Sequence, residues 1–99
     1  SNEFKEQSRR TYDYFREKGV LLSTHALSRM PRLNKSGYPK IQYADVEELL
    51  TSKAGFREDN VKEIYFSEEK QLAIIKNLET QEVVSIVRMK KLKEDWKRV

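Results

Sequence analysis

The sequence contains no cysteine and only one histidine among its 99 residues. Without cysteine there can be no disulfide framework and no thiolate metal site, and a single histidine disfavours a zinc site. We therefore expect neither a metal ion nor a cofactor. The absence of cysteine leaves the redox compartment undetermined.

Long apolar runs are also missing. No run approaches the roughly 18 to 20 residues that a membrane-crossing helix needs, and the N-terminal segment SNEFKEQSRR lacks the apolar core of a signal peptide. We expect no membrane span. The chain begins with serine rather than methionine, which suggests a piece of a longer polypeptide. Because 99 residues suit one hydrophobic core, we expect residues 1–99 to form a single domain.

The apolar residues of the first segment recur at helical spacing. Residues 2–18 carry Phe4, Tyr12 and Phe15 near one stripe, with charged residues elsewhere. Gly19 suits the position just after a helix end, because glycine readily adopts a left-handed backbone. These features predict a helix over residues 2–18.

Two shorter helices are expected next. Ser23 or Thr24 can cap a short helix, and Pro31 ends it because proline removes an amide and disfavours helical geometry at the preceding residue. A third helix is predicted over residues 44–53. Between them, residues 34–40 have the composition of an exposed loop.

The second half of the chain is rich in β-forming residues. The runs VKEIYF, QLAIIKNL and EVVSIVRMK are separated by short polar turns, which predicts a three-stranded antiparallel meander. The final stretch KKLKEDWKRV is expected to form a C-terminal helical tail, or an otherwise ordered tail, anchored by Trp96. The predicted fold class is therefore α+β, with N-terminal helices packed on one face of a small antiparallel meander.

The net charge of +4 is unevenly distributed along the chain. No Asp or Glu lies between Glu17 and Asp45, and this window contains Lys18, Arg29, Arg32, Lys35 and Lys40. A second acid-free stretch, residues 83–93, contains Arg88, Lys90, Lys91 and Lys93. If the sheet packs beside the short helix, these side chains form a surface that attracts phosphates. The alternative is a solvated basic face with no ligand. Tyr38 and Tyr43 flank the loop, where they either stack on bases or form the edge of the core.

His25 and Arg29 are four residues apart, so on a helix they project from the same face and can address one ligand. RNA cleavage requires a group that exchanges a proton near neutral pH and a cation that stabilises the phosphorane. His25 suits the first role and Arg29 the second. The alternative is that His25 is a structural or exposed residue at a helix start.

The block STHALSRM is followed by a basic loop, the ADVEELL helix and the segment EIYFSEEKQLAIIKNLETQEVVSIVRMKK. This series resembles the small toxin nucleases of the barnase, EndoU, colicin and RelE-like (BECR) superfamily. More narrowly, it is similar to the family in which a helix with a T-x-H-A-x-x-R-M pattern precedes a β-meander that ends in a v-v-T-v-type strand. The resemblance covers roughly residues 20–92. It implies a BECR-like fold and metal-independent cleavage of RNA, often tRNA.

The resemblance also implies site residues. It places His25 and Arg29 in the active site, and Ser85 stands where related sequences tend to carry threonine, which retains the hydroxyl. Tyr65 and Arg88 are further catalytic candidates. Strict alternation along a strand puts Ser85 and Arg88 on opposite faces, so a bulge or a site at the sheet edge would be needed to use both.

Two functions remain open from the sequence. The first is a ribonuclease toxin domain in which further basic residues hold the flanking phosphates, namely Arg32, Lys35, Lys40, Lys90 and Lys91. Similar domains form the C-terminal tips of contact-dependent growth inhibition toxins and other polymorphic toxins. That resemblance implies delivery from the producing cell into a target-cell cytoplasm and a cognate acidic immunity protein. The second is a non-catalytic module that binds nucleic acid or an acidic protein through the same residues.

Overall fold

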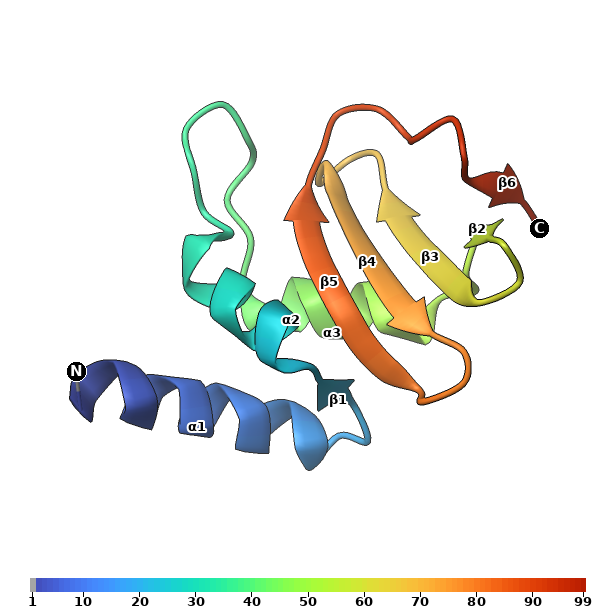
Figure 1. Cartoon of the computed structure of the whole chain (residues 1–99). Helices are drawn as coiled ribbons and strands as arrows, with labels where there is room; N and C mark the ends of the chain where they lie inside the picture. The colour runs from blue at the N-terminus through green and yellow to red at the C-terminus, as the bar shows by residue number, and fades with distance from the viewer. Residues whose placement is uncertain (1) are drawn as a thin grey trace.

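A computed structural model describes residues 2–99 and shows an α+β fold with a six-stranded mixed sheet. The strands are β1 (Leu21–Leu22), β2 (Phe56–Glu58), β3 (Lys62–Ser67), β4 (Leu72–Asn77), β5 (Glu82–Arg88) and β6 (Lys97–Arg98). Their spatial order is β1-β5-β4-β3-β2-β6 (Figure 1). The three long central strands pair antiparallel, as predicted, whereas β1 pairs parallel to β5. None of the helices in residues 2–99 has an apolar stretch long enough to span a bilayer.

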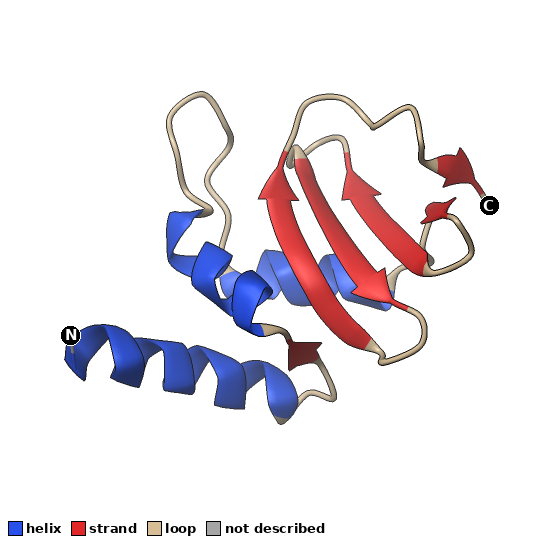
Figure 2. Ribbon diagram, viewed as in Figure 1, coloured by secondary structure: helices blue, strands red, loops and turns tan. Residues whose placement is uncertain are grey.

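Helix α1 (Asn2–Arg16) confirms the predicted first helix, and Gly19 follows it with a φ of 78°. Its C-terminal half is anchored by the buried Phe15, and most of the first ten residues are exposed. The Thr11 hydroxyl donates to the Gln7 carbonyl and lies 2.9 Å from the Tyr43 hydroxyl, which links α1 to the third helix. The N-terminal half of α1 thus extends beyond the sheet (Figure 2).

Helix α2 (Thr24–Arg29) begins at Ser23, whose hydroxyl oxygen accepts from the Ala26 amide as an N-cap. The same hydroxyl donates to the Val84 carbonyl, so the cap also ties the helix start to β5. At Pro31 the α-helix gives way to one 3-10 turn, η1 (Met30–Arg32), as the missing proline amide requires. Buried Ala26 and Met30 hold α2 and η1 against the sheet.

Helix α3 (Tyr43–Thr51) begins with a reciprocal capping pair. The Asp45 amide donates to the Gln42 backbone carbonyl at 2.9 Å, and a carboxylate oxygen of Asp45 accepts from the Gln42 amide at 2.6 Å. The other carboxylate oxygen of Asp45 lies 2.9 Å from the ammonium of Lys70, in the turn between β3 and β4. The Lys70 hydrogen bond, followed by that of the Gln42 amide, lowers the pKa of Asp45.

We expect Asp45→Asn to lower the free energy of unfolding by about 1 kcal/mol near neutral pH. Because the pKa of Asp45 is depressed in the folded state, its contribution is complete above the unfolded value near 3.9 and is lost as pH falls through the folded value. At the alkaline end, Lys70 has a raised pKa, so the pair persists until pH rises through that value. Urea unfolding of both proteins from pH 2 to 8 should show the difference shrinking below about pH 4. A difference that is unchanged at pH 2 would contradict this assignment.

The core lies on both faces of the sheet. On the helix face, Phe15, Ala26 and Val46 pack against strand residues that include Ile74 and Ile86. On the other face, a smaller cluster contains Ile64, Ala73, Ile75 and Trp96.

The predicted C-terminal helical tail is not present. Residues 90–99 run as an irregular segment past the ends of the central strands and end in β6 (Figure 1), and Leu92 and Trp96 pack on the second face of the sheet. The prediction of an anchor at Trp96 is confirmed, since its ring is buried and its indole N–H donates to Glu58 at 2.9 Å. Burial of this ring against the sheet, together with pairing of β6 to β2, replaces the local hydrogen bonds of a helix.

Candidate phosphate-binding cleft

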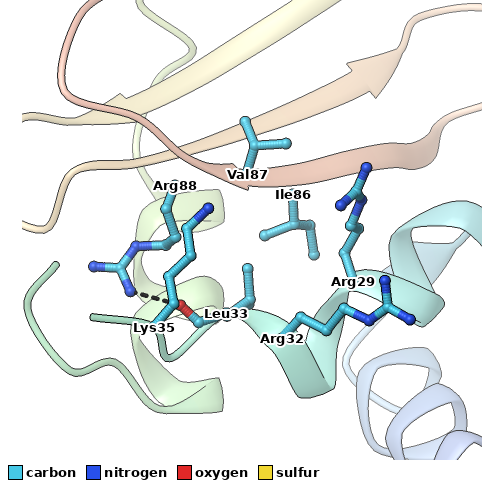
Figure 3. Close-up of a pocket in the computed structure, with 7 residues that line it drawn as sticks. All are labelled: Arg29, Arg32, Leu33, Lys35, Ile86, Val87 and Arg88. Carbon is cyan, nitrogen blue, oxygen red and sulfur yellow. Dashed lines mark hydrogen bonds between the residues drawn. The ribbon is translucent and has the colours of Figure 1, made fainter. Parts of the chain in front are cut away.

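A cleft of about 360 Å³ lies between the α2–η1 segment and strand β5 (Figure 3). Its cationic lining residues are Arg29, Arg32, Lys35 and Arg88, and its apolar lining residues are Leu33, Ile86 and Val87. No carboxylate belongs to this lining. Four cations around an opening without acidic groups favour an anionic ligand, and the phosphates of a nucleic acid satisfy that preference.

The position of the cleft follows from the pairing of β5. Among the described residues, β1 pairs with β5 only through Glu82 and Val83, so the rest of that strand edge has no strand neighbour. The helix that starts at Ser23 lies beside this unpaired edge and brings Arg29 toward it (Figure 3). The cleft therefore combines a sheet edge with the cationic side chains of one helix and its following turn.

Arg88 lies at the end of β5 and is 7% exposed. Its guanidinium donates to four carbonyl oxygens, those of Leu33, Pro39, Lys70 and Gln71, at 2.6 to 3.2 Å. Burial lowers its pKa, while the carbonyl dipoles take the place of water as acceptors. Because four of the five guanidinium N–H groups are occupied, Arg88 is a positioning residue in this structure. Through Leu33 and Pro39, Arg88 joins the start and the end of the basic loop, residues 34–40, to the turn between β3 and β4.

His25 is exposed on α2, one turn before Arg29 and on the same side of the helix. Its carbonyl accepts from the Ser28 hydroxyl at 2.6 Å, and its side chain forms no hydrogen bond or ion pair with residues 2–99. His25 is not part of the cleft lining. Its ring is thus available to a ligand that extends along α2 from Arg29.

Ser85 lies on the sheet face opposite Arg88. The sheet does contain a bulge, because Ile75 pairs with Ser85 whereas Lys76 pairs with Val83. That irregularity precedes Ser85 and leaves the alternation from Ser85 to Arg88 intact. Ser85 instead lines a groove that includes Trp96, on the tail side of the sheet. The structure does not bring Ser85 into the cleft.

Tyr65 is also remote from the cleft, because β4 separates its strand, β3, from β5. The ring is buried in the helix-side core, and the hydroxyl donates to Glu63 at 3.2 Å. Burial, followed by the nearby Glu63 charge, raises the pKa of Tyr65. These contacts give Tyr65 a packing role in the fold.

The residues predicted to bind phosphates are divided between the cleft and its surroundings. Arg32 and Lys35 line the cleft itself. Lys40 lines an adjoining depression with Lys35 and Tyr38, and Lys90 lies 5.1 Å from the Tyr38 ring. Lys91 is exposed and outside the cleft lining. The apolar floor, which includes Leu33 and Ile86, was not anticipated, since its residues carry only the ordinary signal of a core.

No family model, curated protein or solved structure matches this chain. Within residues 2–99, no group of three or more His, Asp or Glu side chains is arranged to hold a metal ion.

Proposed function

We propose that this domain is a ribonuclease that binds RNA phosphates in the cationic cleft and cleaves the backbone with His25, without a metal ion. The observation that carries the proposal is the acid-free cleft of four cations beside the face of α2 that presents His25. A lone exposed histidine would be weak support. Arg29 lines the cleft and is one helical turn from His25, so a phosphate bound by Arg29 lies near the histidine ring.

The chemistry that fits these residues is transesterification at phosphorus. His25 accepts the proton of a ribose 2′-hydroxyl, whose oxygen then bonds to phosphorus. Arg29 donates to the non-bridging oxygens while negative charge develops on the phosphorane. The bond to the 5′ oxygen breaks, that oxygen takes up the proton that His25 had accepted, and a 2′,3′-cyclic phosphate remains. Arg32 and Lys35 hold the phosphates on either side.

In the same proposal the domain is a tRNA-directed toxin that is delivered as part of a larger polypeptide into the cytoplasm of neighbouring bacteria. Such an enzyme requires a protective partner in its producer. We propose an acidic immunity protein that covers residues 25–40 and 88–91, because direct neutralisation of a cationic cleft blocks substrate. Charge complementarity would also speed its capture.

A second candidate is a non-catalytic module that binds nucleic acid or an acidic protein through the same cleft. It is favoured by the placement of three predicted catalytic residues. Ser85 and Tyr65 lie outside the cleft, and the guanidinium of Arg88 is committed to carbonyls. Only His25 and Arg29 then remain as reacting groups.

Incubation of the domain with total tRNA in the presence of a chelator separates these candidates. We expect discrete fragments with cyclic phosphate ends, and binding of a non-cleavable RNA that weakens roughly 20- to 50-fold between 50 and 200 mM salt for three to four phosphate contacts. The double variant Arg29→Gln/Arg32→Gln should reduce both tRNA cleavage and RNA binding. The control variant Arg9→Gln/Arg10→Gln removes equal charge from the exposed part of α1 and should change neither. Salt-sensitive binding with intact tRNA would favour the non-catalytic module, and salt-insensitive binding would contradict both.

A further inference from the structure

Tyr38, at the tip of the basic loop, is surrounded by cations. The Nζ atoms of Lys35 and Lys90 lie 5.2 and 5.1 Å from the centre of its ring, and the Arg88 guanidinium carbon lies 5.2 Å away. The adjoining depression is lined by residues of the segment 34–40 and contains no Asp or Glu. The ring stabilises the cations through its π-face, and a bound anion would lower their mutual repulsion further.

The loop that carries Tyr38 is held in place by several hydrogen bonds. The Asn34 side chain donates to the Ile41 carbonyl and accepts from the Ile41 amide, which closes the loop. Gly37 has a φ of 88°, a backbone conformation that side chains disfavour, and Arg88 donates to the Pro39 carbonyl. The Tyr38 ring therefore has its position set before any ligand binds.

The depression beside Tyr38 adjoins the cleft, because Lys35 lines both. A strand whose phosphates follow Arg29, Arg32 and Lys35 thus arrives next to a half-buried aromatic ring. The cations lie over the ring, so a base stacks on it when a flexible lysine side chain moves aside, and the phosphates of that nucleotide then lie against the ammonium groups. Paired bases inside an RNA duplex have no exposed face to offer.

On these grounds we propose that Tyr38, with Lys35 and Lys90, forms a stacking subsite for one unpaired nucleobase beside the cleaved phosphate. The substrate class is then single-stranded RNA, such as a loop, in preference to duplex. This inference rests on the proposed function. It goes beyond that function by assigning a base contact to a site otherwise described only by its charge.

Three probes test the subsite: a single-stranded 2′-O-methyl RNA 12-mer that resists cleavage, the same strand annealed to its complement, and inorganic tripolyphosphate. We expect Tyr38→Ala to weaken single-strand binding roughly 5- to 150-fold, which corresponds to the usual 1–3 kcal/mol of base stacking. Tripolyphosphate binding should stay within about twofold, since it depends on charge alone. Tyr38→Phe and Tyr38→Trp keep a ring and should retain single-strand affinity.

The outcomes distinguish this proposal from the proposed function. If the unaltered domain binds RNA but Tyr38→Ala binds the single strand as well, or if duplex binds as tightly as single strand, the subsite is overturned and the cleft proposal stands. If Tyr38→Ala weakens tripolyphosphate binding as much as RNA binding, the ring only holds the loop in place, and stacking is again overturned. If the domain binds no RNA, both proposals fail. Retained thermal unfolding together with retained affinity of the phenylalanine variant excludes a folding defect as the cause.

Discussion

His25→Ala should reduce the rate of RNA cleavage by about 100- to 10,000-fold, the usual contribution of a positioned general acid or base. Histidine is the side chain that most readily takes up and returns a proton at neutral pH, and this chain has only one. The cleft cations are unchanged in the variant, so the affinity for a non-cleavable RNA should stay within a few-fold. Initial rates on labelled tRNA and direct binding measurements together test the prediction.

His25 is exposed, so we expect its replacement to leave the stability of the fold unchanged. Because no described side chain bonds to its ring, the alanine variant should unfold at the same temperature as the parent. Thr24→Ala, which alters an exposed neighbour in the same helical turn, should cleave at the parent rate. His25→Gln keeps a hydrogen-bonding side chain but exchanges no proton, and should be as inactive as alanine. A folded alanine variant that cuts at the parent rate would remove His25 from the mechanism and leave the binding module.

The helices and central strands could be predicted from local chemistry. Ser23 caps α2, Pro31 ends it and Gly19 follows α1, and each of these residues acts through its own backbone or its nearest neighbours. The strands β3, β4 and β5 are long runs of β-branched and aromatic residues, and their pairing requires only short turns. Signals of this kind are contained within a window of a few residues.

The short strands and the tail could not be predicted in this way. β1 and β6 have two residues each, and both exist only because a distant strand offers a partner. The segment 90–99 has a charge pattern compatible with a helix. Burial of Trp96 against Ile75 and Ala73 stabilises the folded chain more than local helix formation would. Tertiary packing therefore decided these elements over local preference.

The same distinction applies to the site. Alternation along β5 was sufficient to predict that Ser85 and Arg88 face opposite ways, and the structure agrees. The basic window predicted that Arg29, Arg32 and Lys35 share a surface if the sheet packs beside the short helix, and all three line the cleft. The role of Arg88 could not be predicted, because its four acceptors are carbonyls from two loops whose meeting depends on the whole fold.

Arg88→Ala should lower the free energy of unfolding by about 3–5 kcal/mol, in the upper range for a single substitution. Four buried or partly buried carbonyls lose a charged donor at once, and hydrogen bonds to charged groups contribute about 1.5–3 kcal/mol each without being additive. For a domain of this size, each kcal/mol corresponds to about 4–8 °C in the unfolding temperature. Urea titration of Arg88→Ala and of Lys90→Ala, an exposed charge two residues on, measures the effect.

The substitution Arg88→Lys separates the fold from the arrangement of the cleft. Lysine keeps the charge but supplies three donors from one point, so it cannot satisfy carbonyls that approach from two loops. We expect a folded protein of intermediate stability in which the loop that carries Lys35 and Tyr38 is less well held. Binding of single-stranded RNA should then weaken, although net charge is unchanged. If both Arg88 variants unfold like the parent, the carbonyl contacts do not stabilise the fold. If Arg88→Lys binds RNA normally despite lower stability, Arg88 supports the fold alone and does not set the geometry of the cleft.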